Sequence, residues 1–342
     1  MPFVRRWLLS RILAVAPNRR LYYLFSGTVM FLLLIALWAE LNNREHLGDL
    51  WQTFLRQVQQ ANPLWLAMAA GLMPLNWLAE TQKWRQVVRQ YESLSRGRAL
   101  MAVWIGVSFS LFTPNRVGEY GGRILLVQPR NRWKATLATL VGNYSQLLVL
   151  LSAGLPAAWF FLRRHEVAPM PWWPPLGWAM LAGLALLYLA YFNLRRVFPF
   201  IRRIPKALGR RFLLKEATIL RHFTTRQLSN LLGWSMLRYG IYATQYFLLL
   251  QFFGITPGIA TACAGIATIF LIQTSLPLPP LTGLVARGNL AVWVWLPCGA
   301  NALSSLAVTF LLWIINLILP ALIGTFSLFF VQTAKTTGYD ND

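Results

Sequence analysis

The sequence predicts an all-α polytopic membrane protein with six transmembrane spans and two re-entrant helical hairpins, arranged as an inverted repeat. Three observations support this fold class. Hydrophobic residues make up 56% of the chain and charged residues 12%, about half the charged fraction of a soluble domain. Long apolar runs recur along the chain, and two shorter apolar segments end in stretches that contain proline and glycine. We expect a single integral membrane domain over residues 1–342.

The first predicted span is a nearly unbroken apolar run at residues 21–41. As a helix it is about 31 Å long, at about 1.5 Å per residue, which is enough to cross a bilayer. It is too long for a signal-peptide core and no small-residue cleavage pattern follows it, so we interpret it as an uncleaved span. Five further spans are expected on similar grounds, at residues 63–79, 135–162, 172–193, 231–253 and 303–331.

The basic residues predict the orientation of these spans. The formal charge is +22, and 20 of the 32 lysines and arginines lie in residues 1–20, 83–98 and 195–226. Alternate spans place these three segments on one side, and the positive-inside rule makes that side the cytoplasm. We therefore expect a membrane protein with both chain ends in the cytoplasm, and the charge requires no nucleic-acid partner.

The segment "TPNRVGEYGGR" at residues 113–123 is the strongest candidate for a functional site. The apolar helix before it, residues 99–112, is roughly 21 Å long and too short to cross a core of about 30 Å. A crossing would also put Arg116, Arg123 and the following cations outside, against the charge rule. A hairpin that enters and leaves on the cytoplasmic side removes this conflict. Pro114 would end the inbound helix, and Gly118, Gly121 and Gly122 would permit an open backbone at the tip.

A second hairpin is predicted from internal similarity. "PPLTG" at residues 279–283 repeats the Pro-x-x-x-Gly spacing of "PNRVG" at an offset of 165 residues, and Thr81 and Thr244 lie in similar contexts at an offset of 163. The repeats would be residues 21–162 and 172–331, with Pro279 and Gly283 at the second tip. Inverted repeats with broken helices are typical of transporters. The alternative that residues 259–276 span fully, which would place the C-terminus outside, stays open.

These segments resemble a known family. "TPNRVGEYGGR" is similar to the first signature of the lysylphosphatidylglycerol synthase transmembrane (flippase-like) family, "LPLPPLTGLVARGNL" to a reduced form of its second signature, and "WIINLILPALIG" to its last span. The resemblance implies an inner-membrane protein that moves a phospholipid or related lipid between leaflets. Gly288 stands where a glutamate would follow Arg287. The aminoacyl-transferring domain of the full-length synthases is also missing, so that activity is not expected.

The candidate substrate-binding residues carry charges or hydroxyl and amide groups near the two tips. An arginine at membrane depth costs roughly 2.5 to 3.5 kcal/mol and is normally retained with a partner, and its guanidinium group suits phosphate oxygens. Glu119 would be an ionic partner or a proton carrier. We predict a site formed by Thr113, Asn115, Arg116, Glu119, Arg123, Arg238 and Arg287.

Simpler interpretations stand beside each of these. Arg116 and Arg123 would obey the charge rule equally well in a cytoplasmic loop. Glu80 and Lys83 are three residues apart, the spacing of a pair on a helix surface. Asn289 and Asn316 would form hydrogen bonds between helices, as would the hydroxyl groups of Thr113 and Thr282.

The predicted function is a lipid flippase or transporter for an anionic or modified lipid, without enzymatic activity, cofactor or metal. The lipid could be a phospholipid, an aminoacylated lipid or a polyprenyl phosphate, and the sequence does not choose among them. Two alternatives stay open: a membrane-embedded enzyme that modifies a lipid headgroup, with Glu119 as base, and a non-transporting partner of a separate synthase or glycosyltransferase. Association with such a lipid-modifying enzyme, or as a homodimer, also stays open.

Overall fold

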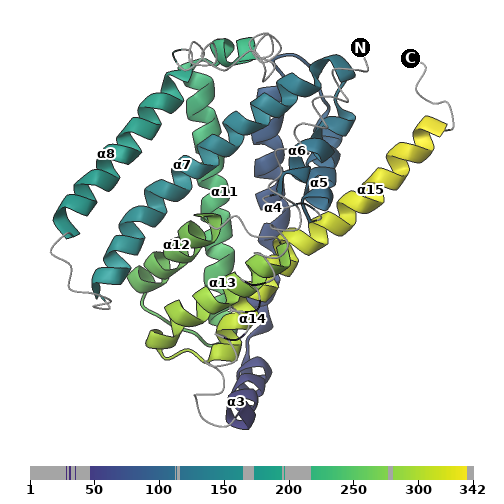
Figure 1. The fold of residues 1–342 in the computed structure, drawn as a ribbon. Helices are drawn as coiled ribbons and strands as arrows, with labels where there is room; N and C mark the ends of the chain where they lie inside the picture. Colours follow the sequence, from purple (N-terminus) through teal and green to yellow (C-terminus); the bar gives the residue numbers. More distant parts are fainter. Residues whose placement is uncertain are drawn as a thin grey trace.

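The computed structural model describes residues 28, 31, 35, 47–111, 113, 116–164, 173–194, 196, 217–275 and 280–336. Every regular element within these ranges is a helix (Figure 1). Several predictions concern parts of the chain outside the described residues: Pro114, Asn115, Pro279, both chain ends and most of the first span. The helices are α3 (Leu47–Gln60), α4 (Pro63–Val88), α5 (Arg96–Leu111), α6 (Gly118–Arg123), α7 (Arg132–Arg164), α8 (Trp173–Phe192), α11 (Thr225–Phe252), α12 (Ile259–Ser275), α13 (Pro280–Trp295), α14 (Ala302–Trp313) and α15 (Leu319–Thr336).

Three helical stretches in the described part of the chain are long and apolar enough to cross a membrane: Pro129–Phe161, Pro175–Phe192 and Ala302–Leu328. They correspond to the predicted spans at residues 135–162, 172–193 and 303–331. Large apolar side chains on α8 face outward, with Trp178, Leu186 and Leu189 at least 60% exposed. Such a surface is stable only in contact with lipid or another apolar partner. The chain is therefore a multi-pass helical membrane protein.

The helices α4 and α11 form the centre of the molecule and pack side by side (Figure 1). They have 26 and 28 residues, or about 39 and 42 Å at about 1.5 Å per residue. Asn62 caps α4 by accepting a hydrogen bond from the Leu64 amide, and Thr224 caps α11 together with Gln227. In the buried interface, Gln245 Nε2 donates to the Ala69 carbonyl at 2.8 Å. Both helices carry polar residues on the faces that meet.

Two broken helical units flank this central pair. The first consists of α5 and α6, and the second of α12 and α13. The 16 residues of α5 and the 17 of α12 extend about 24 and 26 Å, short of a hydrocarbon core of about 30 Å. The helix α5 packs against α15, and α12 packs against α7. Each short helix thus packs on a long helix from the other half of the chain.

Glycines allow these two helix pairs to approach closely. A Cβ atom at Gly324 would lie 2.1 Å from the Trp104 carbonyl oxygen, and one at Gly154 would lie 2.7 Å from Leu271 Cβ. Neither distance is sterically possible without separating the helices. Small residues at helix contacts are the usual means of close packing in membranes.

The glycines of the 113–123 segment have a different role from the predicted one. Gly118, Gly121 and Gly122 lie in the short helix α6 and not in open backbone. A Cβ atom at Gly118 would lie 2.2 Å from the Phe109 carbonyl oxygen, and one at Gly122 would lie 2.6 Å from Gly106 Cα. Two of the three glycines are thus needed because α6 folds tightly onto α5, while Gly121 has open space around its Cα.

The last two helices are joined by a π-helical turn, Ile314–Ile318, without a break in the helical chain. Such turns widen a helix locally and are frequent at functional sites.

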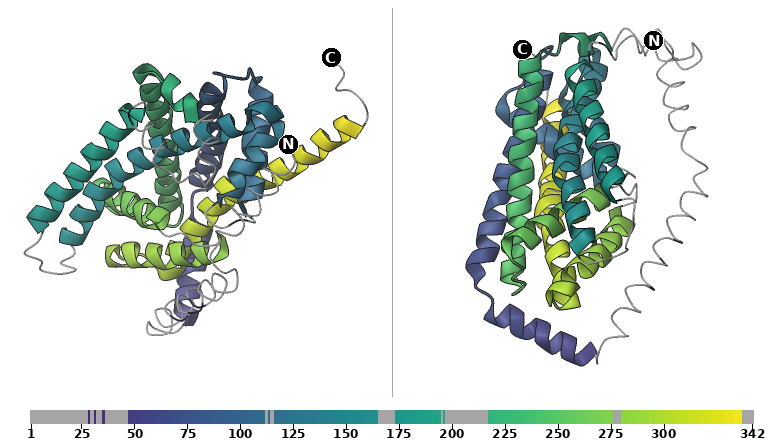
Figure 2. Two further views of the ribbon diagram at one scale, coloured as in Figure 1. Left: turned by 45° about the horizontal axis from the view of Figure 1, so that its top comes forward. Right: turned by 90° about the vertical axis from the view of Figure 1, so that its left-hand side faces the viewer.

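At one end of the bundle, α3 lies across the helix ends (Figure 2). Phe54 of α3 stacks on Phe253 with ring centroids 5.9 Å apart, which attaches α3 to the end of α11.

Candidate functional site

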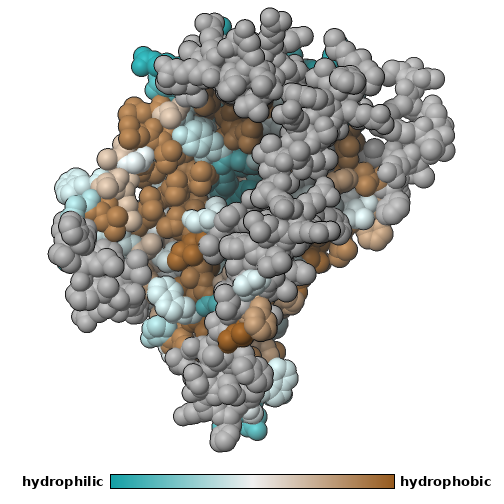
Figure 3. All heavy atoms as spheres, in the orientation of Figure 1, coloured by the Kyte–Doolittle hydropathy of each residue, from teal (hydrophilic) through white to brown (hydrophobic). Residues whose placement is uncertain are grey.

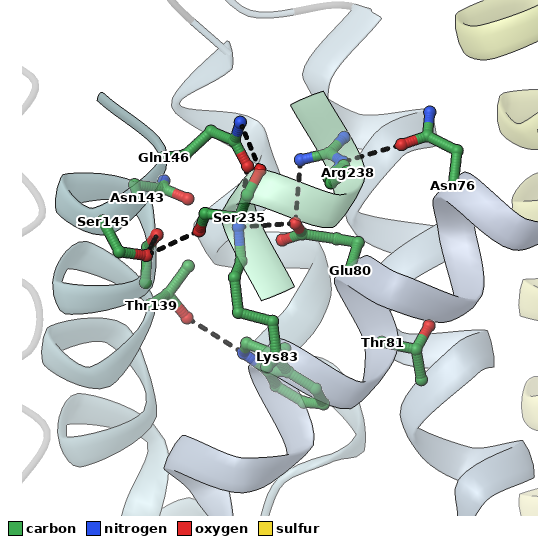
Figure 4. A network of polar contacts seen from close by, with 12 residues as sticks. Asn76, Glu80, Thr81, Lys83, Thr139, Asn143, Ser145, Gln146, Ser235 and Arg238 are labelled. Atoms are coloured by element: carbon green, nitrogen blue, oxygen red, sulfur yellow. Dashed lines mark hydrogen bonds and ion pairs between the residues drawn. The ribbon is translucent and has the colours of Figure 1, made fainter. Parts of the chain in front are cut away.

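A buried carboxylate from the central helix α4 organises the polar interior. The Glu80 side chain is 1% exposed and forms ion pairs with three cations. Its oxygens lie 2.7 Å from Lys83 Nζ, 2.7 Å from an Arg123 guanidinium nitrogen and 2.8 Å from an Arg238 guanidinium nitrogen. These cations come from α4, α6 and α11, so one carboxylate connects α6 to both central helices. Figure 4 shows Lys83 and Arg238 converging on Glu80.

A second carboxylate extends this network to Arg116, just before α6. Glu119 binds Arg123 within α6 and lies 3.4 Å from an Arg116 guanidinium nitrogen. Arg123 is 2% exposed and bridges Glu119 and Glu80. Arg116 is 46% exposed at its side chain and is the one non-glycine residue of the described chain with a positive φ, +57°. This backbone conformation is strained for a residue with a Cβ atom, and such strain is often found at functional sites.

Neutral groups align Arg238 beside the carboxylate. Its Nε atom donates to Asn76 Oδ1 at 3.1 Å, and its guanidinium lies 5.3 Å from the centroid of the Trp77 ring. Asn76 in turn donates to Asn316 Oδ1 at 2.8 Å, in the π-helical turn. The expectation that Asn316 bonds between helices is confirmed. A chain of polar contacts therefore runs from the C-terminal half of the protein to Glu80.

On the opposite side of Glu80, hydroxyl and amide groups line the contact between α7 and α11 (Figure 4). The hydroxyl groups of Ser145 and Ser235 are 2.8 Å apart, and Gln146 Oε1 is 3.5 Å from Lys83 Nζ. Thr81 points away from this cluster and donates to the carbonyl of Trp77 at 2.8 Å. The polar groups around Glu80 thus form a continuous band inside an otherwise apolar bundle.

A cavity of about 610 Å³ opens beside this network. Its walls come from both broken helical units, both central helices, α7 and the turn between α14 and α15. Three of its lining residues are arginines, namely Arg116, Arg238 and Arg287, and none of its described lining residues is acidic. The other lining residues include amides and hydroxyls (Asn76, Gln146, Gln273, Thr274, Ser275, Asn316) and aromatic rings (Trp77, Tyr239, Tyr242, Phe270, Trp313). Among the coloured atoms of Figure 3, which are mostly hydrophobic, a recessed hydrophilic area lies near the middle of the view.

The structure brings most of the predicted site residues to this cavity. Thr113, Arg116, Arg238, Arg287 and the motif residue Gly283 line it. Arg238 faces inward, as the sequence predicts, with 21% of its side chain exposed. Glu119 and Arg123 are not among its lining residues and form an ion pair with each other behind the cavity wall. The Thr113 hydroxyl accepts a hydrogen bond from the Gly118 amide at 2.7 Å, so it also contacts the start of α6.

The interpretation of Glu80 and Lys83 as a surface pair is wrong. Both side chains are at most 2% exposed, and Glu80 is the centre of the ion network. The reason is that α6 and α11 cover the face of α4 on which both residues lie. Asn76, Glu80 and Lys83 follow one another at spacings of four and three residues, which places them on one helix face. That polar line, which runs from the end of the predicted span at residues 63–79 to the residues just after it, was the available signal.

The arrangement is suited to holding an anion. Guanidinium groups form paired hydrogen bonds with phosphate or carboxylate oxygens, and three of them face one cavity inside an apolar bundle. The two carboxylates of the network are already engaged by cations. A helical membrane protein with a cationic cavity between two broken helical units is the class that the fold and site define.

Comparison with known proteins identifies the family within this class. The chain belongs to the family described as the lysylphosphatidylglycerol synthase TM region, which it matches over residues 23–324. The match includes both broken helical units, the ion network and the cavity. No curated protein matches the chain.

Proposed function

We propose that the protein moves a lipid with an anionic headgroup between the leaflets of the inner membrane. The single observation that carries this proposal is the cavity, whose described lining includes Arg116, Arg238 and Arg287 and no acidic residue. A site lined by basic groups in an apolar surrounding attracts anions strongly because little water screens the charge. The family membership links the chain to lipid metabolism or transport.

The dimensions of the cavity support a headgroup as ligand. A volume of about 610 Å³ lies within the usual range of roughly 300 to 1,000 Å³ for small-molecule sites. In this proposal the phosphate binds the arginines while the aromatic rings contact apolar parts of the headgroup. The acyl or prenyl chains stay in the bilayer, where the exposed apolar side chains of the helices also lie. The polar headgroup thereby avoids the cost of crossing hydrocarbon unpaired.

We further propose six spans and two re-entrant hairpins in two inverted repeats, residues 21–162 and 172–331, forming one domain with cytoplasmic ends. The exchanged packing supports this topology, because α5 contacts α15 while α12 contacts α7. A further internal similarity agrees with it: "LPA" at residues 155–157 recurs at residues 319–321, an offset of 164 residues. The glycines at the two exchanged contacts, Gly154 and Gly324, lie close to these motifs.

In the proposed mechanism the two hairpins alternately open the cavity to each leaflet. Rocking of repeat elements about a central site is the usual mechanism in inverted-repeat transporters. The ion network of Glu80 would hold the first hairpin to the central helices, since Arg123 comes from α6 and Arg238 from α11. We propose transport and not catalysis, because Glu80 and Glu119 are both held in ion pairs and are poorly placed to act as a base.

Leaflet exchange in liposomes tests this proposal directly. The purified full chain is reconstituted with a labelled anionic lipid, and the label in the outer leaflet is followed with a membrane-impermeant quencher. The proposal expects faster exchange than in protein-free liposomes and no new lipid product. A new product would support the headgroup-modifying alternative, and neither exchange nor product would support a partner role for a separate enzyme.

A further inference from the structure

The charges around the cavity do not balance. Five cations belong to the connected network and cavity wall, namely Lys83, Arg116, Arg123, Arg238 and Arg287, against the two carboxylates of Glu80 and Glu119. The two other acidic residues that the structure describes lie elsewhere, Asp49 on α3 and Glu92 bonded to Gln128 and Asn131. In the described part of the chain, the five cations thus exceed the two carboxylates by three charges.

The excess charge faces the cavity. Lys83 and Arg123 are at most 2% exposed and lie against Glu80. Arg116, Arg238 and Arg287 are the cations on the cavity wall. Arg116 and Arg238 each share a carboxylate that also binds other cations. Arg287 forms no ion pair with any described residue, although it is partly buried in an apolar helix. A ligand in the cavity is therefore the natural counter-ion for these three groups.

The size of this excess indicates the charge of the ligand. A phosphodiester headgroup brings one negative charge, whereas a phosphate monoester carries about −1.5 to −2 at pH 7. A diphosphate brings more. An aminoacyl ester adds an ammonium group to a phosphodiester and lowers its net negative charge. Glu80 and Glu119, which would have to receive that ammonium, are turned toward the cations and lie behind the wall.

From this balance we infer that the cavity selects a lipid whose headgroup is a phosphate monoester or diphosphate, over phosphodiester lipids and over aminoacylated ones. The inference rests on the proposed lipid-transport function and specifies its substrate class. Each guanidinium can bind two phosphate oxygens, and a terminal phosphate offers more free oxygens than a phosphodiester. Three arginines from different segments, Arg116 before α6, Arg238 on α11 and Arg287 on α13, line the cavity and can therefore bind one terminal phosphate from several sides.

Thermal unfolding of the purified full chain in detergent tests the inference by ligand binding. The probes are farnesyl phosphate, farnesyl diphosphate, dioctanoyl phosphatidylglycerol and its lysyl ester, with inorganic phosphate and pyrophosphate as chain-free controls. We expect the two farnesyl compounds to bind at least tenfold more tightly than phosphatidylglycerol, and the lysyl ester to bind most weakly. Equal or tighter binding of phosphatidylglycerol or its lysyl ester would overturn the inference. If pyrophosphate binds as tightly as farnesyl diphosphate, the site recognises a free phosphate compound and the proposal of a lipid ligand is wrong.

The second ionisation of a phosphate monoester, near pH 6, supplies an independent readout. Between pH 5 and pH 7.5 the probe gains its second negative charge, so the affinity for farnesyl phosphate should rise several-fold while that for phosphatidylglycerol stays constant. A monoester affinity that does not change with pH would contradict the inference. Arg287→Gln should reduce the preference for farnesyl phosphate, whereas Arg56→Gln, at an exposed position on α3, should not.

Failure of this inference can be distinguished from failure of the proposed function. If no lipid exchanges between leaflets in liposomes, transport is refuted, but the order of binding affinities still tests the preference for a terminal phosphate. If exchange occurs and is fastest for phosphatidylglycerol or its lysyl ester, transport stands and the substrate class proposed here is wrong.

Discussion

Replacing Glu80 with glutamine should destabilise the protein more than any other single change to a carboxylate in the described chain. The substitution removes the charge but nearly keeps the shape. Arg123 retains Glu119, so two of the three cations around Glu80, Lys83 and Arg238, lose their carboxylate. Breaking a buried ion pair by removing one partner typically costs about 3 to 5 kcal/mol, and the loss of two pairs favours the upper part of that range.

Unfolding of the purified protein in mixed micelles with increasing dodecyl sulfate measures this free energy. Asp49→Asn is the matched control, since Asp49 is exposed on α3 and its loss should cost less than about 1 kcal/mol. The double variant Glu80→Gln/Lys83→Met removes one of the two uncompensated cations and should recover roughly half of the loss. If Glu80→Gln unfolds at the same detergent fraction as Asp49→Asn, the ion network does not stabilise the fold and the reasoning is refuted.

Three further predictions concern packing, hydrogen bonding and charge. Gly324→Ala should lower the free energy of unfolding by about 1 to 3 kcal/mol through overpacking, because its Cβ would lie 2.1 Å from the Trp104 carbonyl oxygen. The control Gly183→Ala, whose Cβ would have nothing within 4 Å, should be close to neutral in the same unfolding assay. A double-mutant cycle of Asn76→Leu and Asn316→Leu should give a coupling of about 0.6 to 1.7 kcal/mol for their hydrogen bond, and zero coupling would contradict the contact. Arg287→Gln should unfold at the same or a higher detergent fraction than the wild type, because a partly buried cation is removed, and marked destabilisation would show that Arg287 has a structural partner.

The sequence predicted several of the helices because their signals are local. Length and hydropathy identify α7, α8 and the long C-terminal helix formed by α14 and α15. The short lengths of α5 and α12 follow from the charged residues or prolines at their ends. Arg238 was expected to face inward because a charged residue within an apolar span is costly at a lipid-facing position. These inferences need only the properties of one segment at a time.

The network around Glu80 could not be predicted in the same way, because it depends on contacts between distant segments. Arg123 is 43 residues and Arg238 is 158 residues from Glu80 in sequence. From sequence alone, Glu80 and Lys83 have the spacing of a helix-surface pair, and only the packing of α6 and α11 on that face makes it interior. The glycines of α6 illustrate the same limit, since open backbone and close helix contact both require glycine and only the neighbouring helix decides between them.

The central claim is that the arginines on the cavity wall carry an anionic headgroup across the membrane. The most direct test compares leaflet exchange in liposomes for the wild type, Arg116→Gln/Arg287→Gln and the control Arg56→Gln at equal amounts of folded protein. Each lost charge-assisted contact is worth roughly 1.5 to 3 kcal/mol, or about ten- to a hundredfold in affinity, so exchange at a lipid concentration below saturation should fall at least tenfold in the double variant and stay unchanged in the control. Exchange at the wild-type rate by the double variant would contradict the claim.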